Sequence, residues 1–421
     1  MITKIVSKRF DIPNNHTLEV AKANGAYESL DEAFRKPPYA IETEIENSGL
    51  RGKGGGGAPA GAKWCLVSRE DCQSYLVVNA DESEPGTFKD RQILEFDPHL
   101  LIEGMILTCY AIGAHEAYIY IRGEYAAFAK RLNEALDEAY ADGLLGEKVK
   151  DFDYRVDITV HRGAGAYICG EKSALIESLE GNRGHPRLKP HSPSPEYYFG
   201  EPTLVNNVET ISTVPFIVKN GADAYRAFGT DKSPGTLLFG LSGHINNPGI
   251  YEMAFGESMQ DFIDKIGGGV KEGKKLKAVI PGGASTPILS ASEVKDARLD
   301  YESMHAIGSA LGTGGMIVMD EDTCMVSALK NLLSFYHHES CGQCTPCREG
   351  TAWVDGIIRN MLDNRAKPND IELLSDISKT MNGKTICVFA PAVAMVIDGF
   401  ILRFRDEFEN YIQKSLGENH G

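Results

Sequence analysis

The sequence predicts an α/β protein that begins with a Rossmann-like domain and continues into a small α+β domain and a helical bundle. Three observations support this prediction. Between about 74 and 235, strand-like and helical patterns alternate, which is typical of a mainly parallel sheet covered by helices. From 236 a hairpin pattern and a short helix appear, and from Asp322 to the end the pattern is helical.

The alternating region contains short apolar strands separated by amphipathic helices. Strands are expected at Tyr75–Asn79, Ala117–Ile121 and Arg155–Val160. Helices are expected at Leu100–Ile112, which follows a proline, and at Ala126–Tyr140, which is followed by a glycine. Successive parallel strands then align their carboxyl ends at one edge of the sheet, where ligands bind in open α/β folds.

The flanking segments are less regular. Residues 1–50 are polar and irregular, with a short helical pattern near Leu30–Phe34, and are expected to form an arm. Residues 200–220 are expected to form a helix with two asparagines at its start. A hairpin at 236–253 and a strand at Leu276–Ile280 define the α+β domain. The predicted division is therefore 1–50, 51–235, 236–320 and 321–421.

Composition narrows the class of protein. The chain has 421 residues, and 43 basic against 59 acidic residues give a formal net charge of −16. This charge disfavours nucleic acid as a partner. No secretory signal and no run of about 18 apolar residues is present, so we expect a soluble protein that reaches a membrane only through a complex.

Four of the nine cysteines indicate a metal cluster. Cys341, Cys344 and Cys347 are separated from one another by two residues, and Cys387 follows forty residues later. Three closely spaced thiolates with a remote fourth are typical of a [4Fe-4S] cluster, whereas structural zinc usually draws on two separated pairs. Zinc and buried, unreactive cysteines remain the alternatives, and Cys324 competes with Cys387 for the fourth position.

A [4Fe-4S] cluster carries one electron at a time, so if the protein also uses a two-electron donor, a further cofactor must split the electron pair, and a flavin does this. Several loops could hold it: a glycine-rich loop over 49–64 that includes Lys53 and Lys63, an acidic loop over 79–86, and a loop over 163–172 that follows a strand. Glycine lets backbone approach phosphate, and helix N-termini attract anions. Taken singly, each loop could equally be an ordinary turn.

Together these segments resemble the NADH-binding flavoprotein subunit of respiratory complex I. The matching stretches span about 49 to 390 and are GLRGKGGGGAPAGAKW, NADESEPGTFKDR, DPHLLIEGM, YIYIRGEY, GAGAYICGE, ALIESLEG, PTLVNNVET and ESCGQCTPCREG. The resemblance implies an FMN domain, a ubiquitin-like (β-grasp) domain and a helical domain that carries a [4Fe-4S] cluster. It implies NADH oxidation without a side-chain acid or base, because hydride passes directly to FMN, while Glu84 and Glu171 position the reactants.

The resemblance also implies a set of residues around FMN and NADH. They are Gly52, Lys53, Gly54, Gly55, Gly57, Ala58, Gly61, Lys63, Asn79, Asp81, Glu82, Ser83, Glu84, Tyr167, Gly170, Glu171, Lys172, Asn206, Asn207 and Thr210. The implied cluster ligands are Cys341, Cys344, Cys347 and Cys387.

This chain departs from the family pattern near the nucleotide. Ala58 stands where the family usually has phenylalanine, and Lys172 stands in place of a glutamate. Ala60 replaces a threonine, and Lys53 replaces an arginine. These changes suggest weaker NADH binding, tolerance of NADPH or an unusual electron donor, and compensated drift is the competing interpretation.

The implied partners are a small thioredoxin-like [2Fe-2S] subunit and a large iron–sulfur subunit of a peripheral arm on the cytoplasmic side of the inner membrane. Related flavin subunits of NAD-linked hydrogenases and formate dehydrogenases provide an alternative. A third interpretation is an electron-relay subunit that has lost NADH oxidation.

Overall fold

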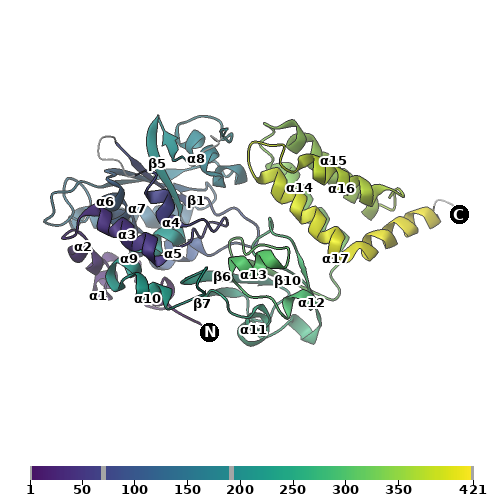
Figure 1. The fold of residues 1–421 in the computed structure, drawn as a ribbon, viewed down its shortest axis with the longest axis horizontal. Coiled ribbons are helices and arrows are strands. Elements are labelled where there is room, and N and C mark those ends of the chain that lie inside the picture. The colour runs from purple at the N-terminus through teal and green to yellow at the C-terminus, as the bar shows by residue number, and fades with distance from the viewer. Residues whose placement is uncertain (1, 68–72, 189–193, 419–421) are drawn as a thin grey trace.

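The computed structural model describes residues 2–67, 73–188 and 194–418, which form an α/β region, a smaller mixed region and a helical region (Figure 1). The α/β region contains α1 (Leu18–Ala23), α2 (Glu28–Ala33), α3 (Pro38–Ser48), α4 (Ala60–Trp64), β1 (Tyr75–Ala80), α5 (Asp90–Phe96), α6 (Pro98–Ile112), β2 (Glu116–Ile121), α7 (Ala126–Ala141), β3 (Asp157–Arg162), α8 (Lys172–Leu179), β4 (Glu196–Tyr198), β5 (Glu201–Asn207), α9 (Val208–Asn220) and α10 (Ala222–Arg226).

The first sheet is mainly parallel, as predicted. Its strand order is β3-β2-β1-β5-β4, in which the first four strands are parallel and β4 is antiparallel to β5. The register places Val78 of β1 beside Ile119 of β2 and Asn206 of β5. The carboxyl ends of β1 and β5 therefore lie side by side.

The prediction of one helix over 200–220 is wrong in its first part. Residues Glu201–Asn207 form β5, and α9 begins only at Val208. Leu204 and Val205 are buried on the two faces of a strand that pairs with β1. Pairing with a distant strand therefore determines that this segment is a strand rather than a helix. Asn207 does cap the helix, because its side chain accepts a hydrogen bond from the Glu209 N–H at 3.0 Å.

Residues 1–50 are not irregular as predicted, because they contain α1, α2 and α3. Each helix is short and buries only a few apolar side chains, such as Leu30 in α2 and Ile41 and Ile45 in α3. The helical pattern predicted near Leu30–Phe34 overlaps α2, whereas the buried positions of α1 and α3 are too few for recognition in the sequence. Packing of α2 and α3 against α6 and α9 stabilises these helices instead.

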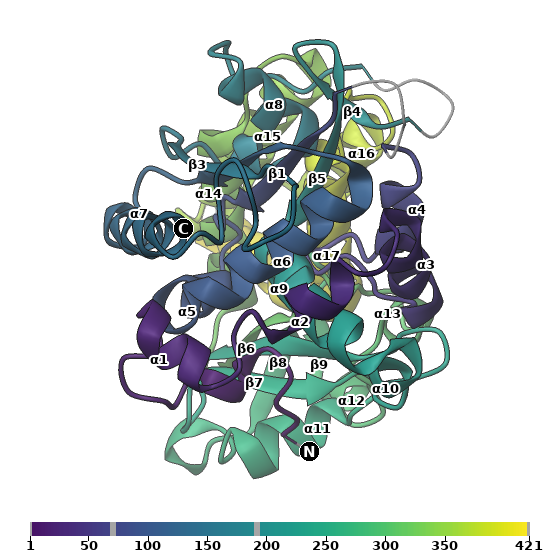
Figure 2. The ribbon, with the colours of Figure 1, turned by 90° about the vertical axis from the view of Figure 1, so that its left-hand side faces the viewer.

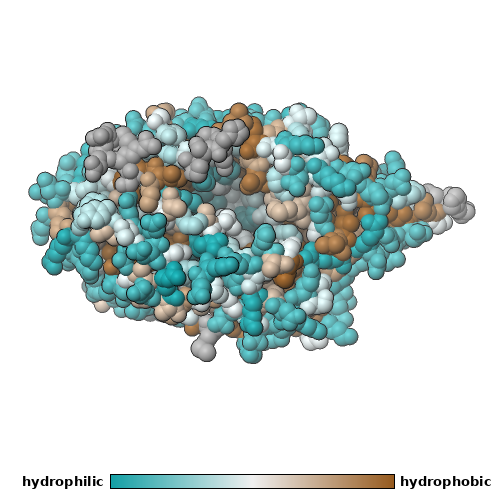
Figure 3. Space-filling model, viewed as in Figure 1, coloured by the Kyte–Doolittle hydropathy of each residue, from teal (hydrophilic) through white to brown (hydrophobic). Residues whose placement is uncertain are grey.

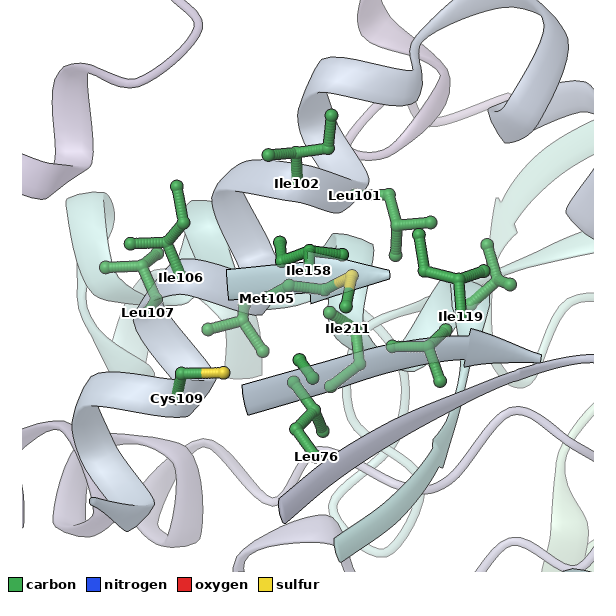
Figure 4. Close-up of a cluster of buried hydrophobic side chains, with 14 of the residues drawn as sticks. Leu76, Leu101, Ile102, Met105, Ile106, Leu107, Cys109, Ile119, Ile158 and Ile211 are labelled. Carbon is green, nitrogen blue, oxygen red and sulfur yellow. The ribbon is translucent and has the colours of Figure 1, made fainter. Parts of the chain in front are cut away.

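The main core lies between the sheet and α6 (Figure 4). The predicted helix at Leu100–Ile112 is confirmed, and it begins at Pro98 with Asp97 accepting a hydrogen bond from the Leu100 N–H. Met105 and Ile106 of this helix belong to the same buried cluster as Leu76 and Val78 of β1. Val77, which points to the other face, packs in a second cluster with the helical region. Figure 2 shows the helical region behind the sheet, opposite α6.

The second region is a mixed five-stranded sheet with short helices. It contains β6 (Thr236–Gly243), β7 (Gly249–Ala254), α11 (Met259–Asp261), β8 (Leu276–Ile280), β9 (Leu289–Ser290), α12 (Ala291–Val294), α13 (Tyr301–Ala306) and β10 (Gly315–Asp320). The strand order is β7-β6-β10-β8-β9; β6 and β10 are parallel, and the predicted hairpin joins β6 to β7.

The last region is helical, as predicted. It contains α14 (Met325–Glu339), α15 (Thr345–Leu362), α16 (Asp370–Met381) and α17 (Phe389–Glu418). No helix of the described residues is long and apolar enough to cross a membrane. The four-part division of the chain at 50, 235 and 320 stays a prediction.

Candidate functional site: two adjoining cavities

The larger cavity, about 480 Å³, lies beyond the carboxyl ends of β1 and β5. A volume of this size suits a nucleotide-like ligand, and Figure 3 shows a hollow in the surface between the α/β and helical regions. Its lining residues are Lys53, Gly54, Gly55, Gly56, Asn79, Asp81, Glu82, Ser83, Glu84, Thr87, Lys89, Asp90, Tyr167, Ile168, Gly170, Glu171, Asn207, Gly282, Ser285, Thr286, Ala310, Gly312, Thr313, Cys387, Val388, Phe389, Pro391, Ala392 and Met395.

The structure brings most of the predicted loops to this cavity. Those predicted residues that line it are Lys53, Gly54, Gly55, Asn79, Asp81, Glu82, Ser83, Glu84, Tyr167, Gly170, Glu171 and Asn207. Among the described residues, the predicted ones outside its lining are Gly52, Gly57, Ala58, Gly61, Lys63, Lys172, Asn206 and Thr210. The prediction missed the wall from the second region (282–286 and 310–313) and the start of α17. The sequence did offer one signal for the wall from the second region: Gly282 and Gly283 closely follow the strand predicted at Leu276–Ile280.

Lys53 points into the protein rather than standing free for a ligand. Its ammonium donates to Thr213 Oγ1 at 2.8 Å and lies 3.2 Å from Glu209 Oε1, and its backbone N–H donates to Thr210 Oγ1 at 2.9 Å. The Lys53 side chain is 1% exposed. This lysine therefore anchors the glycine loop to α9, and Thr210 holds its backbone.

A second buried lysine completes a charge network behind the cavity. Lys89 Nζ lies 2.8 Å from Glu209 Oε2 and 2.7 Å from Asp90 Oδ1. The Asn207 amide donates to Asp90 Oδ2 at 2.6 Å. Burial alone would raise the pKa of Glu209, but the charges of Lys89 and Lys53 outweigh it and lower that pKa. Glu209 therefore stays ionised between two lysines.

Two carboxyl groups at the end of β1 are held in an environment that favours the neutral form. Burial raises the pKa of Asp81 from 3.8 to about 7. Burial, followed by the nearby charge of Asp90, also raises the pKa of Glu82. Asp81 Oδ2 and both amide atoms of Asn206 are buried without a hydrogen-bond partner among the described residues.

Asp81 lines the larger cavity, so its unpartnered oxygen fits a bound cofactor rich in hydrogen-bonding groups, which would supply the partner that the protein does not. The glycines fit as well: a Cβ at Gly54 would lie 3.2 Å from Asn207 Cβ, so a side chain there would crowd the cavity wall. The residues present therefore suit FMN, whose ring and phosphate carry both acceptors and donors.

The raised pKa of Asp81 gives a prediction for the flavin-free chain. A carboxyl whose folded pKa exceeds its unfolded pKa contributes stability below the unfolded value, and this contribution is lost as pH rises through the folded value. Asp81→Asn should therefore remove part of the decline in Tm between about pH 4 and pH 7. Scanning calorimetry across this range tests it, with exposed Asp363→Asn as the matched control. Parallel pH profiles for wild type and Asp81→Asn would contradict the prediction.

Glu84 joins three parts of the molecule at the cavity. Its carboxylate accepts hydrogen bonds from Tyr167 OH at 2.5 Å and from the Ser285 N–H at 2.6 Å. Burial raises the pKa of Glu84. The Tyr167 ring in turn packs against Phe335 of α14 and Phe389 of α17, with centroids 5.2 and 5.8 Å away.

The four predicted cysteines come together around a smaller cavity. Cys341 and Cys344 lie in the loop before α15, Cys347 lies in its first turn, and Cys387 lies just before α17; all four line this cavity. The Ile386 N–H donates to Cys344 Sγ at 3.4 Å, and Ser340 Oγ lies 3.3 Å from Cys347 Sγ. Burial raises the pKa of Cys347 to about 11.

The alternative ligand Cys324 lies elsewhere. It directly precedes α14, its thiol is 3.4 Å from Tyr411 OH, and it is absent from the lining of the small cavity within the described chain. Among the residues that the structure describes, no three or more His, Cys, Asp or Glu side chains are placed to hold a single metal ion. A cubane is wider than one ion, so four thiols around a common cavity suit a [4Fe-4S] cluster better than zinc.

The two cavities share a wall. Ile168, Cys387 and Phe389 line both of them. A ligand in the larger cavity would therefore be separated from a cluster by single side chains. Fold and site define a class: an electron-transfer protein with a nucleotide-sized cavity beside a four-cysteine cluster site.

Comparisons with known proteins agree with this class. Residues 45–216 match the Nuo51 FMN-binding domain, residues 237–318 match the SLBB domain, and residues 327–411 match the NADH-ubiquinone oxidoreductase-F iron-sulfur binding region. The chain is 48% identical over 401 residues to the F subunit of NADH-quinone oxidoreductase from Rickettsia bellii, covering 95% of this chain and 96% of that protein. It is 44% identical over 420 residues to the corresponding protein of Mycobacterium tuberculosis, covering 98% and 94%. The chain belongs to the family of NADH-quinone oxidoreductase F subunits.

Solved structures of a second kind of enzyme are also similar. An NAD+-reducing [NiFe]-hydrogenase in the H2-reduced state matches with a TM-score of 0.82 and 37% identity, covering 90% of this chain and 64% of the hydrogenase chain. The air-oxidised state matches with a TM-score of 0.84 and 35% identity, covering 94% and 68%. The fold predicted from the sequence is thereby confirmed, and the present chain spans about two thirds of those longer chains.

Proposed function

We propose that this chain is the NADH-oxidising flavoprotein subunit of a complex I-type NADH-quinone oxidoreductase. The observation that carries the proposal is the wall shared by the two cavities, formed by Ile168, Cys387 and Phe389. When bound, FMN would accept hydride from NADH and supply single electrons to a [4Fe-4S] cluster. The protein's contribution is to hold the two sites side by side.

The residues that we propose around FMN are those whose polar groups face the larger cavity. They are Gly54, Gly55, Asn79, Asp81, Glu82, Ser83, Tyr167, Gly170, Glu171 and Asn207, supported by Lys53, Thr210 and the unsatisfied amide of Asn206. Glu84, whose carboxylate accepts hydrogen bonds from Tyr167 and Ser285, is the residue that we propose orients NADH. Such positioning is the main way in which a site without an acid or base accelerates hydride transfer.

The proposed cluster ligands are Cys341, Cys344, Cys347 and Cys387. The proposed partners are a small thioredoxin-like [2Fe-2S] subunit and a large iron–sulfur subunit, in a peripheral arm on the cytoplasmic side of the inner membrane. Membership of the family supports a place in an oxidoreductase complex, and the individual partners are inferred from the resemblance.

The decisive experiment measures NADH:ferricyanide reductase activity of the FMN-loaded chain with its small partner, together with flavin, iron and acid-labile sulfide per chain. Activity with one FMN and four irons supports the proposal. Bound flavin without activity toward NADH or NADPH would instead favour an electron-relay role. The hydrogenase likeness favours the second candidate, a diaphorase of an NAD-linked hydrogenase or formate dehydrogenase, and co-purification of a metal-site subunit would indicate it.

The departure at Lys172 supports altered nucleotide use. Lys172 begins α8, and its ammonium lies 3.6 Å from Glu196 Oε1. Burial, followed by the charge of Lys172, lowers the pKa of Lys63 to about 8, which indicates that the two lysine ammonium groups lie near each other. A positive potential there would tolerate the additional 2′-phosphate of NADPH, which a glutamate would repel.

We therefore expect Lys172→Glu to lower kcat/KM for NADPH about tenfold, or roughly 1.4 kcal/mol, while that for NADH changes less. Steady-state kinetics with both nucleotides test this. Lys379→Glu, an exposed charge reversal on α16, is the control. A strong NADH preference in wild type that Lys172→Glu leaves unchanged would show that the substitution is compensated drift.

A further inference from the structure

The glycine loop has two faces with different neighbours. Residues 53–56 line the larger cavity, whereas Arg51 and Gly57 at the two ends of the loop contact the second region. The ends are also pinned to each other, because the Gly52 N–H donates to the Ala58 carbonyl at 2.8 Å. The loop therefore lies between the cavity and the second region, with Gly54 and Gly56 exposed.

Arg51 links the loop to α13 and its surroundings. Its guanidinium donates to the Gly57 carbonyl, to the Lys232 carbonyl at 2.9 Å and to Glu302 Oε1 at 2.8 Å. Glu302 is held in turn by Ser233 Oγ, which donates to its other carboxylate oxygen at 2.6 Å. Burial acts to raise the pKa of Glu302, but the hydrogen bonds from Ser233 and Arg51 outweigh it and lower that pKa.

Tyr301 covers the outer face of the loop. Its ring lies beneath the Arg51 guanidinium, with 4.5 Å between Cζ and the ring centroid, and its hydroxyl donates to the Gly52 carbonyl at 3.3 Å. Gly57 has φ +61°, and a Cβ there would lie 2.5 Å from Tyr301 Cε1. The ring therefore fits against bare backbone at one end of the loop and bonds to it at the other.

We propose that Arg51 and Tyr301 are positioning residues: they clamp the glycine loop in its cofactor-binding shape, and through this clamp α13 affects nucleotide affinity at a distance from the cavity. Five of the six residues from 52 to 57 are glycine, so an unclamped loop would sample many conformations. Apparent affinity falls in proportion to the fraction of molecules with a competent loop.

The inference rests on the proposed function, and two measurements, steady-state kinetics and hydrogen–deuterium exchange, distinguish a failure of the clamp from a failure of the proposed function. In the FMN-loaded chain with its small partner, Arg51→Met should raise KM for NADH about tenfold and change kcat less than about twofold, because only the competent fraction falls. Hydrogen–deuterium exchange should show faster uptake in the peptide that contains residues 52–57. Flavin content is measured for each variant so that kcat is expressed per bound FMN, and the cluster EPR signal should match wild type.

Three further variants sharpen the test. Glu302→Gln keeps the shape but weakens the Arg51 contact and should show a smaller effect of the same kind. Tyr301→Leu should loosen the loop even if Arg51→Met proves unstable. Arg405→Met removes an exposed arginine that pairs with Glu372 and Glu409 in the helical region, and it should change neither readout.

Unchanged uptake over 52–57 in both Arg51→Met and Tyr301→Leu would overturn the clamp, as would a fall in kcat with constant KM. If wild type oxidises neither nucleotide, the proposed function fails, and the exchange measurement still decides whether the clamp exists.

Discussion

Cys347→Ser is expected to abolish the reduced-state EPR signal of the [4Fe-4S] cluster while the flavin absorption remains. Cys347 is buried in the first turn of α15 and lines the small cavity with three other thiols. Serine offers a hydroxyl that is a poor ligand for a cluster that selects soft thiolates. Anaerobic reduction with dithionite, followed by low-temperature EPR and flavin absorption spectra of the same sample, measures both outcomes.

Two other cysteine variants identify the fourth ligand. Cys387→Ser should behave as Cys347→Ser does, because Cys387 lines the same cavity. Cys324→Ser should retain the full signal, because Cys324 lies beside Tyr411 instead. A full EPR signal in Cys347→Ser would show that the ligand assignment is wrong. If Cys324→Ser lost the EPR signal and Cys387→Ser kept it, Cys324 would be the fourth ligand instead of Cys387.

Glu209→Gln is expected to lower the free energy of unfolding of the flavin-free chain by about 3–5 kcal/mol, because it leaves buried lysines without their shared counter-ion. Glu209 is fully buried between Lys53 and Lys89, and Oε1 also accepts a hydrogen bond from the Leu238 N–H of β6 at 2.9 Å. Loss of this anchor should also weaken FMN retention. Urea unfolding and flavin released on gel filtration measure the two effects.

The control is Glu349→Gln, which removes an exposed carboxylate that pairs with Arg348. Exposed ion pairs contribute about 0–1 kcal/mol, so little change is expected there. Equal stabilities for the two variants would mean that the buried network does not support the cavity.

The parts of the fold that the sequence predicted are those specified by neighbouring residues. The strands near Tyr75 and Ala117 and the helix at Leu100–Ile112 have continuous apolar patterns, and the structure confirms them. The prediction for Glu201–Asn207 failed because its identity as a strand depends on pairing with β1, which is more than a hundred residues away in the chain. Within 1–50 the helical pattern predicted near Leu30–Phe34 overlaps α2, whereas α1 and α3 were missed because each buries too few side chains to show a period.

The candidate site likewise has features that local sequence predicts and features that depend on distant residues. Three cysteines in seven residues already indicate a cluster, and the glycine and acidic loops indicate a nucleotide site, because their chemistry is local. The direction of the Lys53 side chain was not predictable, since Glu209 and Thr213 lie on a distant helix.

By itself the sequence determined the fold class, the four cysteines and the loops at the ends of the strands, since short-range spacing and residue type carry that information. Only the tertiary structure decided which walls close the larger cavity. Ser285 reaches Glu84 across 201 residues of chain, and the start of α17 brings Phe389 and Cys387 between the two cavities. Such contacts depend on how whole domains pack, and packing free energy is a property of the assembled surfaces rather than of any one segment.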